Sequence, residues 1–253
     1  MKDKYKEILQ GLSEDTSPKD QNDRILIIDG LNTFIRSFAV NPSVNEDGIH
    51  VGGMTGFLHS IGYAIRNIKP TRVIICFDGK GGSKRRKKIY PDYKANRAVK
   101  TAFNRYKEFA SQEDESDSMK KQFGRLIEYL NCLPVTMLAV DNIEADDTIG
   151  YLAEQALPKS EVIIMSTDKD FLQLANGRVK IWSPTKKKMY NDKSVFEEFG
   201  IFSALTIHDT ASVVGTASLY SNESVTYASV IKLGRTLWIV PLLIGASLYS
   251  KSE

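Results

Sequence analysis

The chain of 253 residues is long enough for one α/β domain with an additional segment, and its composition, 42% hydrophobic and 26% charged, is typical of a globular protein. A net charge of +3 excludes a strongly basic or acidic protein, so a charged partner must be recognised by local clusters. The long apolar run Leu237–Tyr249 contains Pro241 and is shorter than a membrane span of about 20 residues, which predicts no membrane partner.

The N-terminal 22 residues are largely polar, which predicts an arm or a frayed helix and no signal peptide. Two cysteines, Cys76 and Cys132, lie in apolar contexts without metal-ligand spacing. We therefore expect both to be buried free thiols in a reducing compartment, which favours a cytoplasmic protein.

Short apolar runs alternate along the chain with segments that have helical spacing. Strands are expected at 25–29, 73–78, 135–140, 161–166 and 179–183, and helices at 55–68, 119–131, 143–157 and 171–176. Gly30-Leu31-Asn32 is expected to form a turn. The alternation predicts an α/β fold with a mostly parallel central sheet, flanked by helices through right-handed crossovers.

Seven carboxylates form four clusters at or near the ends of these strands. They are Asp29, Asp78, Glu144, Asp146, Asp147, Asp168 and Asp170. The carboxyl ends of parallel strands line one crevice, so these side chains are expected at one edge of the sheet. Without a counter-charge they would repel and raise each other's pKa values. Oxygen ligands of this kind select Mg²⁺ or Mn²⁺ rather than zinc, and such a site most often performs phosphoryl chemistry with two metal ions.

The acidic run Glu144–Asp147 has a plainer explanation as well. Acidic residues in the first turn of a helix favour the positive end of its dipole, and for this run alone both explanations are open. Glu144 and Asp147 share a helix face, with Asp146 turned by about 100° from Asp147. The pair Asp168 and Asp170, taken alone, is often only a turn. The four clusters in this order favour the metal site.

A basic stretch extends from Lys80 to Lys100. It contains nine cations against the single acid Asp92, with Tyr90 and Tyr93 between them. Charge runs are usually solvated surfaces, but cations beside a carboxylate cluster should form ion pairs unless another anion requires them. A phosphate backbone is such an anion, and the tyrosines could stack on unpaired bases.

The segments IIDGLN, FDGKGGSKRRKKIYPDYKANR, EADD and STDKDFLQL, in this order, resemble the 5′ nuclease superfamily of flap endonucleases and 5′–3′ exonucleases. The segment WSPTKKKMY and the compact size look most like the ribonuclease H of T-even phages. The resemblance covers about residues 22–200. It implies a PIN-like catalytic core over residues 23–200, with a basic helical arch over about 80–118.

The resemblance also implies an activity, namely hydrolysis of phosphodiesters near 5′ ends of RNA–DNA hybrids or flapped DNA during replication. Two Mg²⁺ ions are expected, and Mn²⁺ is expected to substitute. Asp29, Asp78, Glu144, Asp146 and Asp168 match the first metal site, with Asp147 and Asp170 nearer the second. Partners would include a single-stranded DNA-binding protein or a sliding clamp, in the host cytoplasm if the protein is viral.

The basic stretch supplies the residues that the resemblance assigns to the nucleic acid. Lys94 and Arg97 match the basic pair that contacts the scissile phosphate. Tyr93 and Arg85 match positions that line the arch. The expected nucleic-acid-binding set is Lys84, Arg85, Arg86, Tyr93, Lys94 and Arg97.

The chain departs from the family after residue 200. Where a G-D-x-x-D-N segment and a helix–hairpin–helix are expected, it has VVGTASLYSNE, and residues 203–253 carry only six charged residues. The region is therefore expected to be irregular or incomplete. Two explanations are open: a diverged or replaced subdomain, or out-of-frame translation after about residue 203. The second is favoured because GTASLYSN resembles a shifted version of the expected segment.

Three functional hypotheses follow. The first is a metal-dependent 5′ nuclease, supported by the first metal site together with Lys94 and Arg97. The second is a weakened protein that binds 5′ ends or flaps, supported by the missing second-site aspartates. The third is a different nuclease of the PIN type, against which the long basic stretch and YKANR argue.

Overall fold

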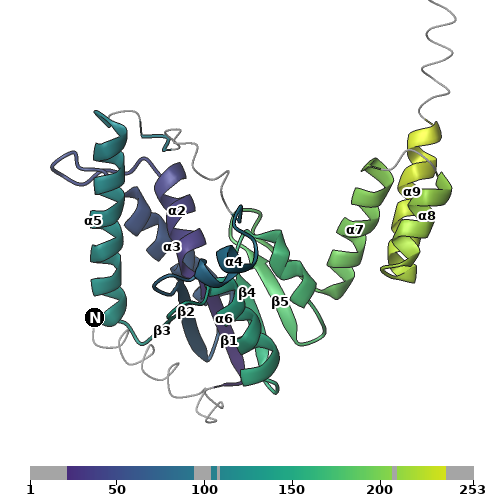
Figure 1. The fold of residues 1–253 in the computed structure, drawn as a ribbon, viewed down its shortest axis with the longest axis horizontal. Helices are drawn as coiled ribbons and strands as arrows, with labels where there is room; N and C mark the ends of the chain where they lie inside the picture. Colours follow the sequence, from purple (N-terminus) through teal and green to yellow (C-terminus); the bar gives the residue numbers. More distant parts are fainter. Residues whose placement is uncertain (1–21, 94–103, 107–108, 207–209, 238–253) are drawn as a thin grey trace, which may run out of the picture. The chain divides into compact units, whose positions relative to one another are not determined.

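The computed structural model of this chain describes residues 22–93, 104–106, 109–206 and 210–237 (Figure 1). Two compact units are present. The first contains the chain up to Leu174 and Arg178–Met189, and the second contains Ala175–Gly177 and the chain from Tyr190. Within the described ranges, no helix has both the length and the apolar character that crossing a membrane requires.

A six-stranded sheet with the order β3-β2-β1-β4-β5-β6 forms the centre of the first unit in the described chain. Its strands are β1 (Arg24–Asp29), β2 (Arg72–Asp78), β3 (Thr136–Val140), β4 (Glu161–Met165), β5 (Val179–Ser183) and β6 (Lys188–Tyr190). The pairs that join β3, β2, β1, β4 and β5 are all parallel. The predicted α/β class is confirmed, and five of these strands lie within about a residue of their predicted bounds; β6 was not predicted.

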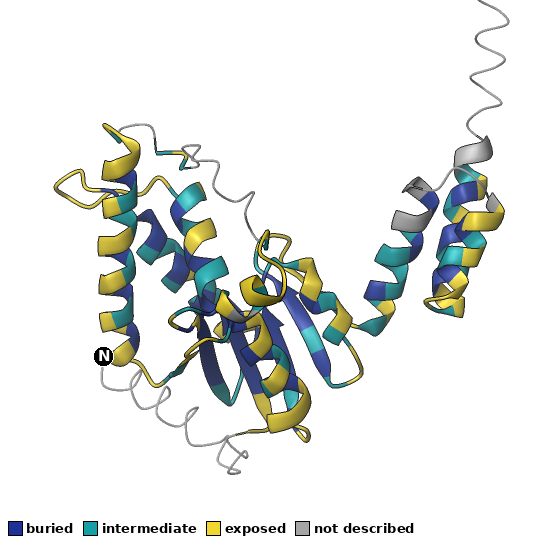
Figure 2. Ribbon diagram, viewed as in Figure 1, coloured by how far each residue is buried: buried dark blue, intermediate teal, exposed yellow. Residues whose placement is uncertain are grey.

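Helices cover both faces of the sheet. The helices of the first unit are α2 (Gly30–Val40), α3 (Gly52–Ile68), α4 (Lys84–Ile89), α5 (Gln112–Asn131) and α6 (Ala145–Tyr151), with a π-helical turn η2 (Leu152–Ala156) and a 3₁₀ turn η3 (Lys169–Leu174). Leu26 and Ile28 of β1 pack with α3 and α5 in the main core. Ile25 and Ile27 alternate to the other face, where α6 contacts β1, β2 and β3. The strands are therefore mostly buried, and the outer helix faces are exposed (Figure 2).

The predicted turn at Gly30–Asn32 is wrong, because these residues form the first turn of α2. The Asp29 side chain accepts a hydrogen bond from the Asn32 N–H and caps the helix. Gly30 is required there, since a Cβ atom would lie 2.4 Å from the Phe77 ring. A helix that starts directly after a strand carries the same Asp-Gly signal as a turn, so the sequence pattern alone does not separate the two.

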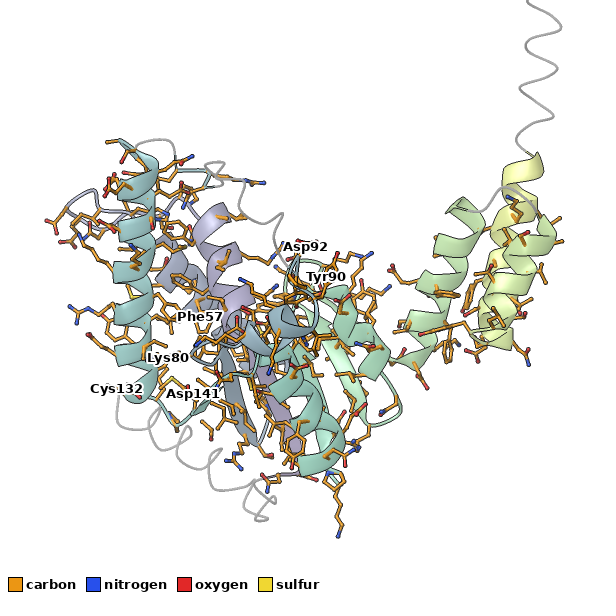
Figure 3. All side chains as sticks on the ribbon, viewed as in Figure 1. Phe57, Lys80, Tyr90, Asp92, Cys132 and Asp141 are labelled. Atoms are coloured by element: carbon orange, nitrogen blue, oxygen red, sulfur yellow. The ribbon has the colours of Figure 1, made fainter. Side chains whose placement is uncertain are left out.

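Two further expectations differ from the structure. Helix α5 begins at Gln112 rather than near residue 119, because the Ser111 side chain caps it and its first turn is acidic. Cys76 is a buried free thiol as predicted, but Cys132 is exposed at the C-terminal end of α5 (Figure 3). The prediction of a buried Cys132 is wrong, because Cys132 is the C-cap residue that follows the last residue of α5 and lies at the surface.

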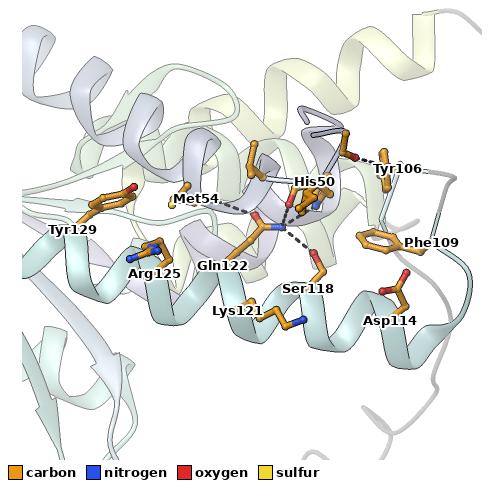
Figure 4. A pocket seen from close by; sticks show the side chains of 13 residues that line it. His50, Met54, Tyr106, Phe109, Asp114, Ser118, Lys121, Gln122, Arg125 and Tyr129 are labelled. Carbon is orange, nitrogen blue, oxygen red and sulfur yellow. Dashed lines mark hydrogen bonds between the residues drawn. The ribbon is translucent and has the colours of Figure 1, made fainter. Parts of the chain in front are cut away.

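The buried side chain of Gln122 fastens the loop before α3 to helix α5 (Figure 4). Its Oε1 accepts from the Gly53 N–H at 2.8 Å, and its Nε2 donates to the His50 carbonyl at 2.8 Å and to Ser118 Oγ at 3.1 Å. The His50 ring is held in turn by the Asn41 carbonyl, 2.8 Å from its Nε2. Beside this network lies a cavity of about 580 Å³, whose wall includes Gln122 and His50.

Replacement of Gln122 by leucine should lower the free energy of unfolding by about 1–3 kcal/mol, because the Gly53 N–H and the polar atoms around His50 lose their buried partner. Urea denaturation measures this change. The matched control is Gln155→Leu, at an exposed position of η2, which should stay within about 0.5 kcal/mol of the parent. Equal stability of both variants would contradict a fastening role for Gln122.

The second unit is helical in its described part. It contains α7 (Asp192–Thr206), α8 (Thr210–Ser218) and α9 (Asn222–Leu237). Ala204, Val213, Ala217 and Ala228 form its small buried core. This segment was expected to be irregular, but its small residues let helices pack without a strong amphipathic pattern. The assignment of residues 1–22, 23–200 and 201–253 to an arm, a catalytic core and a replaced segment stays a prediction.

Candidate active site

The carboxyl ends of four neighbouring strands meet at one edge of the sheet and bring the acidic segments with them. Asp29 ends β1, Asp78 ends β2, and Asp168 follows β4 after two residues. Helix α6, which carries Asp146 and Asp147, begins five residues after β3. The parallel register places Asp29 beside Cys76, and Asp78 beside Val140. The strand order β3-β2-β1-β4 therefore makes these acidic segments neighbours in space.

Asp29 is buried, and both of its oxygens accept hydrogen bonds. Oδ1 accepts from the Asn32 N–H and Oδ2 from the Ser166 hydroxyl, each at 3.1 Å. Ser166 Oγ accepts in turn from the Asp168 N–H at 3.1 Å, and Thr167 donates to Asn32 Oδ1 at 2.8 Å. The ends of β1 and β4 are thus tied together by polar contacts that the sequence analysis did not identify.

Burial raises the pKa of Asp29 to about 6, against an ordinary value of 3.8. The hydrogen bonds from Asn32 and Ser166 oppose this rise, and the negative charges of Asp146 and Asp78 add to it. These three carboxylates are therefore close enough to interact electrostatically. A positive ion among them would favour the ionised form of Asp29.

Asp78 caps helix α6, because its Oδ1 accepts from the Ala145 N–H at 2.7 Å. The loop after β2 reaches this position by lying directly on the β3–α6 loop. The Gly79 N–H donates to the Ile143 carbonyl, and a Cβ atom on Gly79 would lie 1.7 Å from the Val140 carbonyl oxygen. Only glycine permits this approach, which explains the glycine after Asp78 in the FDGKGG segment.

Glu144 occupies the N-cap position of α6, but its side chain makes no capping hydrogen bond. It is 2% exposed, and its Oε2 accepts from Arg86 Nη1 and from the Tyr93 hydroxyl, the latter at 3.0 Å. Arg86 Nη2 donates to Asp147 Oδ1 at 2.6 Å, so one guanidinium bridges the two carboxylates predicted to share a helix face. The helix-capping explanation does not account for this orientation of Glu144.

Asp168 and Asp170 are two residues apart and form a local turn, as this spacing commonly does. The Asp170 N–H donates to Asp168 Oδ1 at 3.0 Å, and Asp170 is exposed within η3. Among the residues that the structure describes, no group of three acidic, histidine or cysteine side chains is arranged to hold a metal ion. The assignment of all seven carboxylates to a metal site stays a prediction.

The chemistry of the edge nevertheless fits a divalent cation. All of the candidate ligands are hard carboxylate oxygens, and the guanidinium of Arg86 already stands in as a cation at Glu144 and Asp147. The negative charges of Asp146 and Asp78 add to the rise in the pKa of Asp29, so a cation bound beside Asp29 would favour its ionised form.

Part of the predicted nucleic-acid-binding set lies on α4. Lys84 is exposed at its start, and Arg86 is partly buried against the acidic edge. The Tyr93 hydroxyl accepts a hydrogen bond from Arg86 Nη1 at 2.8 Å and donates one to Glu144 Oε2. Lys94, Arg97 and the side chain of Arg85 lie outside the described residues, so their predicted roles stay predictions.

A parallel α/β sheet with acidic residues at its carboxyl edge agrees with the PIN-like 5′ nuclease core that the sequence predicted. The family model described as 5′–3′ exonuclease, N-terminal resolvase-like domain, matches residues 24–200. The chain belongs to this family, which decides against a separate PIN-type nuclease. A second model, described as conserved hypothetical protein 698, matches residues 184–253, overlaps the first and covers only a smaller part of the chain.

Curated relatives agree with this family. The chain is 27% identical over 206 residues to a 5′–3′ exonuclease of Bacillus subtilis, covering 78% of this chain and 64% of the relative. It is 31% identical over 193 residues to a 5′–3′ exonuclease of Aquifex aeolicus, covering 76% and 61%. The chain thus spans less than two thirds of the length of these relatives.

Solved structures show the same fold. The bacteriophage T5 D15 flap endonuclease, crystallised as a pseudo-enzyme-product complex with DNA and metal ions, is 18% identical with a TM-score of 0.53, covering 73% of this chain and 66% of that chain. The T5 D15 protein co-crystallised with metal ions is also 18% identical, with a TM-score of 0.51 and coverage of 83% and 84%. The particular resemblance to phage ribonuclease H stays a prediction.

Proposed function

We propose that this chain is a metal-dependent 5′ nuclease that hydrolyses phosphodiesters near the 5′ ends of flapped DNA or RNA–DNA hybrids. The carrying observation is the acidic edge, where Asp29, Asp78 and the start of α6 lie together and interact electrostatically. Membership of the 5′–3′ exonuclease family supports the choice of substrate class.

The acidic edge would hold two divalent ions, Mg²⁺ or its substitute Mn²⁺. Asp29, Asp78, Glu144, Asp146 and Asp168 are proposed for the first ion, and Asp147 and Asp170 for the second. When bound, such a pair lowers the pKa of a water nucleophile and stabilises the leaving oxygen. Ser166 and Asn32 keep the Asp29 carboxylate oriented, since each donates to one of its oxygens.

The basic stretch is proposed to bind the phosphates. Lys94 and Arg97 would offset the charge that develops on the scissile phosphate, and Lys84, Arg85 and Arg86 would contact the strand that enters the arch. Tyr93 would stack on an unpaired base once it leaves Glu144.

The comparisons support this activity. Both bacterial relatives are named 5′–3′ exonucleases, and the T5 D15 protein was crystallised with DNA and metal ions. Action during replication, ribonuclease H-like specificity, a cytoplasmic location (the host cytoplasm if the protein is viral), and partnership with a single-stranded DNA-binding protein or a sliding clamp belong to the proposal.

A second candidate is a weakened protein that binds 5′ ends without efficient hydrolysis. The supporting observation is helix α8, which contains Gly215–Ser218 where an acidic segment was expected and carries no carboxylate. If the second ion depends on aspartates of such a segment, hydrolysis would be slow while binding persists.

Cleavage of a 5′-labelled flap duplex and of an RNA–DNA hybrid, with Mg²⁺, Mn²⁺ or EDTA, separates the two candidates. The nuclease should release short 5′ products with either metal and none with EDTA, and Asp168→Asn should abolish the release while sparing binding. Preference for the hybrid would support ribonuclease H-like specificity. Binding without cleavage in both metals would favour the weakened binder.

A further inference from the structure

Arg86 is a cation of the basic stretch that the structure describes in contact with carboxylates. Its guanidinium lies against the acidic edge, where it donates to Glu144 Oε2, to Asp147 Oδ1 at 2.6 Å and to the Tyr93 hydroxyl at 2.8 Å. Its carbon Cζ also lies 5.6 Å from the centre of the Tyr93 ring. Arg86 thus contacts two carboxylates that lie far along the chain, Glu144 at 58 residues and Asp147 at 61 residues. It also contacts the phenol of Tyr93, which follows α4.

The environment of Glu144 explains why a cation is needed there. This carboxylate is almost fully buried, and a buried charge without a counter-charge is strongly unfavourable. Arg86 supplies the counter-charge from within the chain, and its planar guanidinium can serve both carboxylates at once. The two divalent ions proposed to bind at Glu144 and at Asp147 would use the same oxygen lone pairs and would repel the guanidinium.

We propose that Arg86 is an internal counter-cation that competes with divalent metal for Glu144 and Asp147, so that metal binding releases Arg86 and Tyr93 from the acidic edge. This inference rests on the proposed function, which supplies the metal. Arg86 is a positioning residue here, since it acts through the two carboxylates.

The release has a consequence for nucleic-acid binding. Arg86 and Tyr93 lie on the segment that leads directly to Lys94, so metal binding frees a cation and an aromatic ring beside the predicted phosphate contacts. Coupling of two binding events is reciprocal. A nucleic acid that draws Arg86 away should therefore strengthen metal binding.

The test compares metal affinity in the full chain and in Arg86→Met, which keeps the length of the side chain but removes its charge. Mg²⁺ is titrated by calorimetry, and the melting temperature is measured with and without Mg²⁺. Arg86→Met should melt at a lower temperature without metal and bind Mg²⁺ about tenfold more tightly, because the guanidinium no longer competes for the two carboxylates. Arg86→Lys should fall between the two, since an ammonium cannot bridge both carboxylates in the same way.

The control is Arg125→Met on α5, which removes an exposed arginine paired with Glu128 at 2.6 Å and should leave Mg²⁺ affinity unchanged. If Arg86→Met does not fold, Tyr93→Phe replaces it. That variant removes the hydroxyl contacts to Arg86 and Glu144 without changing the charge, and should tighten Mg²⁺ binding by a smaller factor.

A purely structural role for Arg86 predicts the opposite sign, because loss of support for Glu144 would weaken metal binding. Unchanged or weaker Mg²⁺ affinity in Arg86→Met, or in Tyr93→Phe if that variant is used, would overturn the competition and leave the proposed nuclease intact. Absence of Mg²⁺ binding by the wild-type chain and every variant would overturn both.

Discussion

Replacement of Asp29 by asparagine should raise the stability of the metal-free protein at pH 7.5 while lowering metal-dependent hydrolysis by about 10³-fold or more. Asn removes a charge from a buried site that already faces the charges of Asp78 and Asp146. It keeps an oxygen to accept the Asn32 N–H, so the cap of α2 is retained. The same change therefore relieves repulsion and removes a proposed metal ligand.

The pH dependence fixes the sign of the stability effect. Because the pKa of Asp29 is raised from 3.8 to about 6 in the folded state, its protonated form is favoured by folding. Its favourable contribution is complete below pH 3.8 and is lost as the pH rises through about 6. The loss above pH 6 is on the order of 3 kcal/mol, and Asp29→Asn should abolish it.

Thermal unfolding in EDTA from pH 4 to pH 8 measures this effect, and the cleavage assay measures hydrolysis. The gain in stability of Asp29→Asn should grow between pH 4 and pH 7 and then level off. Asp141→Asn, at an exposed position of the loop between β3 and α6 (Figure 3), is the matched control and should change neither quantity. A variant that is less stable than the parent at pH 7.5 would show that the Asp29 charge is already compensated.

Simultaneous replacement of Lys94 and Arg97 by alanine should lower the rate of cleavage by about 10²–10⁴-fold and the affinity for DNA far less. The resemblance places these cations at the scissile phosphate, where they stabilise charge that develops only during the reaction. Single-turnover cleavage and equilibrium binding of a 5′-flap duplex separate the two effects.

The matched control removes two other cations of the same stretch. Lys87→Ala with Lys88→Ala, on the exposed part of α4, should lower the salt dependence of binding by up to about 0.9 per lost phosphate contact and leave the rate of cleavage unchanged. If both double variants lose affinity alike and neither loses rate, Lys94 and Arg97 serve only as backbone anchors.

Local sequence patterns predicted the sheet well because strand formation here depends on short apolar runs. The bounds of β1, β2 and β4 agree with the runs at 25–29, 73–78 and 161–166. Sequence patterns gave a wrong prediction where the same residues are typical of two different local structures. Asp-Gly after a strand signals a turn as readily as a capped helix, and here the Asp29 side chain caps a helix that begins at Gly30. The small residues of α8 and α9 likewise gave no clear helical period.

The sequence by itself determined the α/β class, the family, and the gathering of acidic segments at one sheet edge, because strand ends and their acids are read from neighbouring residues. Only the tertiary structure decided what each carboxylate faces. Asp78 caps α6 across 67 residues, Asp29 meets Ser166 across 137, and Arg86 meets Glu144 across 58. Such pairs depend on how loops pack on one another. The spacing of apolar residues within one segment carries no information about contacts between residues this far apart in the sequence.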